Sequence, residues 1–193
     1  MSYLTLGSLY LEFPEHQNAS GFYRDLNLEN ATTTTRYQVD DVTYTRTTFA
    51  SFTDNVIIMH IKASKANALN FTIAYNCPLV HKVNVQNDKL TVTCQGKEQE
   101  GLKAALRAEC QIQVKTNGTL RPAGNTLQIN EGTEATLYIS AATNYVNYQD
   151  VSADESRRTS EYLKRAMQIP YEKALKSHIA SVSYTHLRAH ETD

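Results

Sequence analysis

The sequence lacks tryptophan, lacks a long apolar run and lacks an excess of either charge. Without a run of about eighteen apolar residues, no segment is expected to span a bilayer. Lysine and arginine number 19 against 20 aspartates and glutamates, so no basic surplus is available to follow a phosphate backbone, and nucleic acid is not an expected partner. The length of 193 residues fits one domain, or one domain with a small appendage.

Cysteine is also scarce. Cys77, Cys94 and Cys110 are odd in number and lack the paired short spacing of a zinc finger or ribbon, so we predict buried free thiols and no metal site. A disulfide between two of them would require an oxidising compartment and suitable geometry, and the sequence shows neither. Residues 1–15 contain no basic region followed by an apolar region, so we do not expect them to act as a signal peptide.

Motifs for catalysis are missing as well. There is no G-x-S-x-G nucleophile elbow and no glycine-rich phosphate loop, so no catalytic residue and no cofactor-binding residue is predicted. Acid–base catalysis by a pair of carboxyl groups needs the two groups to converge, but Asp25 and Glu29 would lie roughly 13 Å apart along a strand. The adjacent Asp40 and Asp41 suit a turn better than a converging pair. Four N-x-S/T sequons, which arise easily by chance in a chain rich in Asn and Thr, occur at Asn18, Asn30, Asn70 and Asn117.

A strong β pattern is present. From Tyr23 to Ile61, β-branched and aromatic residues alternate with polar ones, and Asp40-Asp41 supplies a hairpin turn. Leu9 and Leu11 fall on one face of an earlier strand, which Pro14 ends. The predicted strands are 4–13, 22–28, 32–39, 43–52, 56–61, 69–75, 82–85, 90–94, 102–114, 126–130 and 135–141. Many short strands at this spacing predict an all-β antiparallel sandwich.

One of these strands is ambiguous. The segment Lys103 to Glu109 has a helix-favouring composition, but it lies among hairpin signals, and we assign it to a strand.

The periodicity changes near residue 152. Ser152 and Glu155 have the spacing of a capping box, and Pro170 suits the first turn of a second helix. Two short helices are therefore predicted after the sandwich, with apolar stripes formed by Tyr162, Leu163, Ala166 and Met167 and by Ala174, Leu175 and Ile179. Residues 181–193 break every preceding pattern and read as the translation of a sequencing adapter, so His186 and His190 are not taken as metal ligands.

Four blocks carry a family resemblance: LGSLYLEF, YRDLNLENA, YTRTTFASFTDNVIIMHI and ISAATNY, in that order. Over residues 3–180 the chain resembles the amino-terminal β-sandwich and linker helices of glycoside hydrolase family 95, the inverting α-L-fucosidases. The resemblance implies a large sandwich, amino-terminally truncated because about a hundred further residues usually precede these blocks. The implied division is a sandwich at 1–146, a helical linker at 147–180 and a non-native tail at 181–193.

In that family an (α/α) barrel after the linker carries the catalytic groups, and no matching position exists in this chain. The resemblance therefore implies no catalytic residue here, no cofactor, an intramolecular barrel as partner and a fucosylated glycan as substrate of the parent enzyme. The fragment alone is expected to be inactive, and the parent to be a periplasmic or secreted bacterial enzyme.

Two other functions remain open. The first is a free-standing carbohydrate-binding module, in which tyrosines would replace the missing tryptophan as stacking platforms; the candidates are Tyr23, Tyr37, Tyr44, Tyr145 and Tyr148. His16 lies in the loop after the first strand, and such a loop at the end of a sandwich can approach the active site of a neighbouring domain. The second alternative is the sandwich of another (α/α)-barrel glycosidase or phosphorylase. The sequence leaves the substrate-binding residues unknown.

Overall fold

The computed structural model describes residues 5–98, 101 and 104–182, which contain twelve strands and two helices. The strands are β1 (Ser8–Glu12), β2 (Ser20–Asn27), β3 (Thr32–Val39), β4 (Val42–Ser51), β5 (Val56–Ala63), β6 (Leu69–Asn76), β7 (Val80–Gln86), β8 (Lys89–Gln95), β9 (Arg107–Thr116), β10 (Thr119–Ala123), β11 (Thr126–Gly132) and β12 (Glu134–Thr143). The helices are α1 (Glu155–Ala166) and α2 (Tyr171–Val182).

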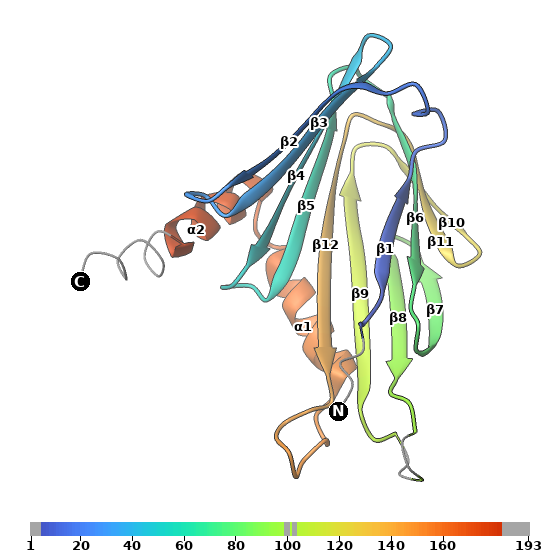
Figure 1. Cartoon of the computed structure of the whole chain (residues 1–193), viewed down its shortest axis with the longest axis vertical. Helices are drawn as coiled ribbons and strands as arrows, with labels where there is room; N and C mark the ends of the chain where they lie inside the picture. The colour runs from blue at the N-terminus through green and yellow to red at the C-terminus, as the bar shows by residue number, and fades with distance from the viewer. Residues whose placement is uncertain (1–4, 99–100, 102–103, 183–193) are drawn as a thin grey trace.

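The strands form two antiparallel sheets. The smaller has the order β1-β6-β11-β10, and the larger has the order β2-β3-β4-β5-β12-β9-β8-β7. Figure 1 shows the smaller sheet lying in front of the larger one, with both helices behind. The predicted antiparallel β-sandwich followed by two short helices is therefore confirmed.

Local sequence fixes the hairpins. Val39 pairs with Val42 across the turn at Asp40-Asp41, and Asp40 has a φ of 51°, which aspartate tolerates better than most residues. Asn87 takes the same role between β7 and β8, with a φ of 53°. These tight turns set the register of both hairpins, so that alternate side chains face the space between the sheets.

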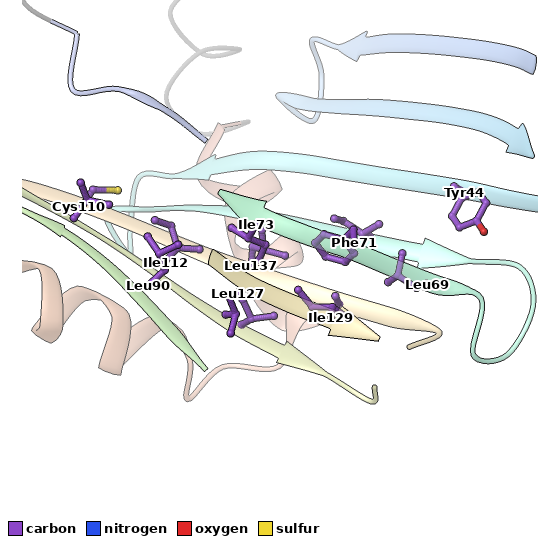
Figure 2. Close-up of a cluster of buried hydrophobic side chains, with 14 of the residues drawn as sticks. Tyr44, Leu69, Phe71, Ile73, Leu90, Cys110, Ile112, Leu127, Ile129 and Leu137 are labelled. Carbon is purple, nitrogen blue, oxygen red and sulfur yellow. The ribbon is translucent and has the colours of Figure 1, made fainter. Parts of the chain in front are cut away.

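The main core lies between the sheets. Leu69, Phe71 and Ile73 of β6 recur with the period of a strand and are fully or almost fully buried. Figure 2 shows them beside residues from β8, β9, β11 and β12, namely Leu90, Ile112, Leu127, Ile129 and Leu137. Each such side chain contributes roughly 1.5–3 kcal/mol by leaving water, so this interface is the main source of stability.

A second cluster joins the helices to the outer face of the larger sheet. Leu163 and Ala166 of α1 and Ala174 of α2 pack with sheet residues that include Phe49 and Tyr138. These three helix positions belong to the predicted apolar stripes. His178, which the sequence did not single out, is also buried on α2, stacked on Phe49 at 4.7 Å.

Part of the larger sheet extends beyond the smaller one. Figure 1 shows β2, β3 and β4 diverging from β6, β10 and β11. β2 is an edge strand that is exposed along nearly all of its length, and Phe22 and Leu26 are 61% and 59% exposed. Exposed apolar side chains on an unpaired edge mark a surface suited to contact with further protein.

Three strand predictions need correction. β10 was not predicted, and it contains Pro122, which cannot donate a ladder hydrogen bond and is tolerated because β10 is an edge strand. The strand predicted at 102–114 begins only at Arg107 and runs to Thr116; residues 104–106 lie outside it, and residues 102 and 103 lie outside the described part of the chain. The first strand, predicted at 4–13, is shorter in the structure and runs only from Ser8 to Glu12; residue 4 lies outside the described part of the chain.

The predicted helix starts also need correction. Asp154, not Ser152, is the N-cap of α1, and its carboxylate accepts a hydrogen bond from the Arg157 amide at 2.8 Å. Glu155 does not fold back on Ser152, because it binds the Arg107 guanidinium at 2.8 Å. Pro170 precedes α2, where its carbonyl accepts from the Lys173 and Ala174 amides. The predicted adapter tail from residue 183 onward, with His186 and His190, lies outside the described residues, whereas residues 181 and 182 belong to α2.

The N-cap assignment can be checked by mutation. Asp154→Ala should lower the free energy of unfolding by about 1 kcal/mol, because an amide of the first turn loses its partner. Ser152→Ala should change it by less than about 0.5 kcal/mol, since the Ser152 side chain is exposed. Urea denaturation of both variants measures the difference. A larger loss of unfolding free energy in Ser152→Ala than in Asp154→Ala would show that Ser152 caps the helix, as the sequence predicted.

Candidate functional site

A cavity of about 580 Å³ lies at the end of the sandwich where the β1–β2 loop meets the β3–β4 hairpin. Its walls come from both sheets, and the polar or aromatic side chains among them are Glu15, His16, Asp40, Asp41, Tyr44, Asn70 and Asn130. Carboxylates, amides and aromatic rings are the groups that bind sugar hydroxyls and sugar faces. The cavity is therefore the candidate binding site of this domain.

His16 is held in place by aromatic neighbours. Its Nδ1 is 2.8 Å from the Tyr37 hydroxyl, and its ring stacks on Phe13 at 4.8 Å and lies 4.3 Å from the ring of Tyr44. Burial lowers the pKa of His16, and the nearby Glu15 carboxylate opposes this only in part. The histidine is thus a neutral, fixed polar group at pH 7.

The two tyrosines beside His16 also stay neutral. Burial raises the pKa of Tyr37 to about 12. The pKa of Tyr44 is raised as well, first by burial and then by the charges of Glu15 and Asp40. The Tyr44 hydroxyl donates to the Ala68 carbonyl at 3.1 Å, so it serves the framework of the cavity. These groups can bind a neutral polar ligand, but they do not form an acid–base pair.

The acidic residues that the sequence offered as carboxyl pairs lie in two separate regions of the domain. Asp25 lies on β2 opposite Thr34 and is exposed, as is Glu29, so neither reaches the cavity. Asp40 and Asp41 form the predicted turn and also line the cavity, a second role that the sequence did not reveal. Asp41 contacts Lys65, and this hydrogen bond lowers the pKa of the Asp41 carboxyl.

The tyrosine candidates are dispersed. Tyr37 and Tyr44 reach the cavity region and stack on each other at 5.5 Å. Tyr23 packs under the Arg36 guanidinium on β3, at 5.6 Å. Tyr145 and Tyr148 are 49% and 86% exposed in the loop before α1, at the opposite end of the sandwich (Figure 1). No single aromatic platform gathers the five.

The cysteine prediction is confirmed, since Cys77, Cys94 and Cys110 are free and buried. Within the described ranges, no group of three or more His, Cys, Asp or Glu side chains is arranged to hold a metal ion. Neither of the two described helices is long and apolar enough to cross a membrane.

Two of the four sequon asparagines have a structural role. The side-chain oxygen of Asn70 accepts a hydrogen bond from the Glu131 amide, and that of Asn117 accepts one from the Glu134 amide.

Two half-buried histidines, His60 and His16, give the domain a pH response. His60 lies under α2, with its Nδ1 2.9 Å from the Thr136 hydroxyl and its ring stacked on Tyr171 at 4.2 Å. Burial lowers the pKa of His60, and Lys62 acts in the same direction, although the carboxylates of Glu134 and Glu172 oppose the shift. The pKa of His16 is lowered too. The unfolded chain therefore binds more protons than the folded one below pH 6.5.

It follows that the free energy of unfolding should fall as the pH drops from 7.5 to 5.5. Carboxyl groups with lowered pKa, such as Glu155, lose their contribution only in more acidic solution. Urea denaturation at intervals across this range measures the slope. A His60→Gln variant should show a shallower slope, and an unchanged slope in that variant would remove His60 as a source of the response.

Comparison with known proteins agrees with the sandwich geometry. The family model "Glycosyl hydrolase family 65, N-terminal domain" matches residues 1–148. A solved structure titled "Putative kojibiose phosphorylase from human microbiome" superposes with a TM-score of 0.54 at 12% sequence identity, covering 84% of this chain and 23% of that one. The "Alpha-L-fucosidase 2" of Arabidopsis thaliana is 37% identical over 82 residues, which is 41% of this chain and 10% of the plant protein.

These findings define a β-sandwich domain of a carbohydrate-active enzyme. More particularly, the chain belongs to the glycosyl hydrolase family 65 N-terminal domains, because the family model covers well over half of its residues. The predicted family resemblance is supported in its coarser form, the N-terminal domain of a glycosidase or phosphorylase of the family 65 or 95 type. The chain spans about a tenth of the plant fucosidase and under a quarter of the phosphorylase.

Proposed function

We propose that this chain is the non-catalytic N-terminal portion of an enzyme that removes terminal α-L-fucose from glycans. The observation that carries the proposal is the 37% identity to the plant alpha-L-fucosidase over 82 residues. The likeness to the phosphorylase structure, at 12% identity, supports the fold and leaves the substrate open. The proposed role of the domain is to support a catalytic barrel and to help to shape access to it.

Two surfaces suit that role. Domains of this family normally pack against a catalytic barrel, and the exposed β2 edge, with Phe22 and Leu26, presents apolar side chains for such a contact. The helices α1 and α2 are fixed to the outer face of the larger sheet and would set the direction in which the chain continues. We further propose a sandwich at 1–146, a linker at 147–180 and a non-native tail at 181–193.

The first test is a continuous read of the source DNA through both ends of this chain, followed by expression of the complete open reading frame. The purified product is assayed for release of free fucose from a fucosylated oligosaccharide, with the matched galactosylated oligosaccharide as control. Kojibiose is tested with and without inorganic phosphate. Fucose release supports the proposal, whereas phosphate-dependent cleavage of kojibiose would replace it with the phosphorylase alternative.

A second candidate function is carbohydrate binding by the domain itself, which the cavity of about 580 Å³ favours. Titration calorimetry of the isolated chain with fucose, galactose and a fucosylated oligosaccharide tests it. If the cavity binds sugar, the double variant Glu15→Gln/Asp40→Asn should weaken binding by about tenfold or more, because each removes a charged acceptor of hydrogen bonds. The matched change Glu29→Gln, at an exposed position away from the cavity, should leave it unchanged.

A further inference from the structure

Two of the three buried thiols face each other across the two sheets. Cys77 directly follows β6 of the smaller sheet, and Cys94 lies on β8 of the larger sheet. Their Sγ atoms are 3.4 Å apart, and both residues are 4% exposed. Because the two strands belong to different sheets, a bond between these atoms would cross-link the sandwich itself.

The geometry lies close to that of a disulfide. A disulfide bond is about 2.05 Å long, so the sulfur atoms would need to approach by about 1.4 Å from their separation of 3.4 Å. A small rotation about the Cα–Cβ bonds moves Sγ atoms by this amount. The third thiol, Cys110, lies on β9 in the same sheet as Cys94 and pairs in register with Val92, so a bond between Cys94 and Cys110 would not join the two sheets.

We propose that Cys77 and Cys94 form an inter-sheet disulfide when the chain folds in an oxidising environment, while Cys110 remains a thiol. The oxidant is a small disulfide such as oxidised glutathione. Each cysteine gives up one proton and one electron, the new sulfur–sulfur bond forms, and one glutathione disulfide is reduced to two glutathione thiols. This site is independent of which substrate the parent enzyme cleaves.

Burial determines when the bond can form. Burial and the neighbouring Cys77 thiol raise the pKa of Cys94 to about 12, and burial raises the pKa of Cys110 to about 11. Since the thiolate is the reacting species, the folded domain should be oxidised slowly at neutral pH. The cross-link therefore forms during folding, and the same burial then shields it from reductants.

The cross-link has a defined structural effect. It closes a loop of about eighteen residues, counted from Cys77 to Cys94, which contains the β7–β8 hairpin at the edge of the larger sheet. Closing a loop of this size restricts the unfolded chain and should raise the melting temperature by on the order of 5–10 °C. The gain should disappear when a reductant is present during unfolding.

The test is refolding of the complete 193-residue chain either with a mixture of reduced and oxidised glutathione or with dithiothreitol. The products are alkylated under denaturing conditions and mapped by mass spectrometry. The expected oxidised product has one alkylated cysteine, Cys110, and one peptide pair joined through Cys77 and Cys94. Three alkylated cysteines after oxidative refolding, or a bond that includes Cys110, would overturn the proposal.

Single variants serve as matched controls. Cys110→Ser should retain both the cross-link and the dependence of the melting temperature on the oxidant. Cys77→Ser and Cys94→Ser should lose both, and they should melt at the same temperature with and without reductant. The peptide map of the unaltered chain does not depend on the folding of any variant, so it decides the proposal even if one of them precipitates.

Discussion

Leu137→Ala should lower the free energy of unfolding by about 3–5 kcal/mol, because a fully buried leucine is replaced by a cavity. Leu137 is fully buried on β12, which pairs with β5 on one side and β9 on the other. Its side chain lies between the sheets, close to residues of the smaller sheet in Figure 2. Removing it leaves a cavity where both sheets meet, and the rigid ladders on either side limit collapse into that space.

Urea denaturation followed by circular dichroism measures this loss. Leu26→Ala is the matched control, because Leu26 is 59% exposed on the edge strand β2 and its truncation should cost less than about 0.5 kcal/mol. Leu137→Met keeps most of the volume and should cost less than about 1.5 kcal/mol. Equal losses in Leu137→Ala and Leu26→Ala would mean that the two sheets do not pack as described.

Local sequence patterns predicted most of the strands because several of them, such as β1, β7 and β8, alternate more and less exposed residues and lie beside recognisable turns. The hairpin at Asp40-Asp41 is an example, since its residues tolerate the backbone angles that the turn requires. β10 escaped prediction because Pro122 and the exposed residues around it remove the usual signal of a strand. Only its pairing with β11 places it in the sheet.

Long-range pairing is the part that local patterns could not supply. β12 inserts between β5 and β9, although seventy residues, 64–133, separate it from β5 in sequence. The candidate cavity depends on such pairing, because it joins a loop after β1, the β3–β4 turn and residues of β6 and β11. The sequence drew attention to His16 and read Asp40 as a turn residue, but it had no means of placing them in one cavity.

The long-range contacts of the block ISAATNY could not be predicted from the sequence either. The block supported the family resemblance, but it did not reveal the role of any of its residues. Its asparagine, Asn144, is completely buried just after β12. Its side-chain oxygen accepts from the Arg107 amide at 2.8 Å, and its nitrogen donates to the carbonyls of Ala105 and Val151 at 3.0 and 2.8 Å. One side chain therefore ties the start of β9 to the segment that leads into α1.

Asn144→Ala should lower the free energy of unfolding by about 2–4 kcal/mol, because three part-buried hydrogen bonds, one from an amide and two to carbonyls, are lost together. It should also loosen the connection to α1, because the Val151 carbonyl loses its side-chain partner close to the Ala153 amide, which bonds the Asn144 backbone carbonyl at 3.1 Å across the loop. Urea denaturation measures the first effect, and faster hydrogen exchange at the Arg107 and Ala153 amides measures the second.

Asn147→Ala provides the matched control for that change. Asn147 is exposed, and its side chain accepts only a local hydrogen bond, from the Gln149 amide at 2.9 Å. Its replacement should cost less than about 1 kcal/mol and leave exchange at Arg107 unchanged. If the two variants lost the same stability and showed the same hydrogen exchange, the Asn144 side chain would contribute no more than a local hydrogen bond in a turn. If they differ as expected, a single buried amide holds the linker helices in register with the sandwich, and the direction in which the chain leaves this domain depends on it.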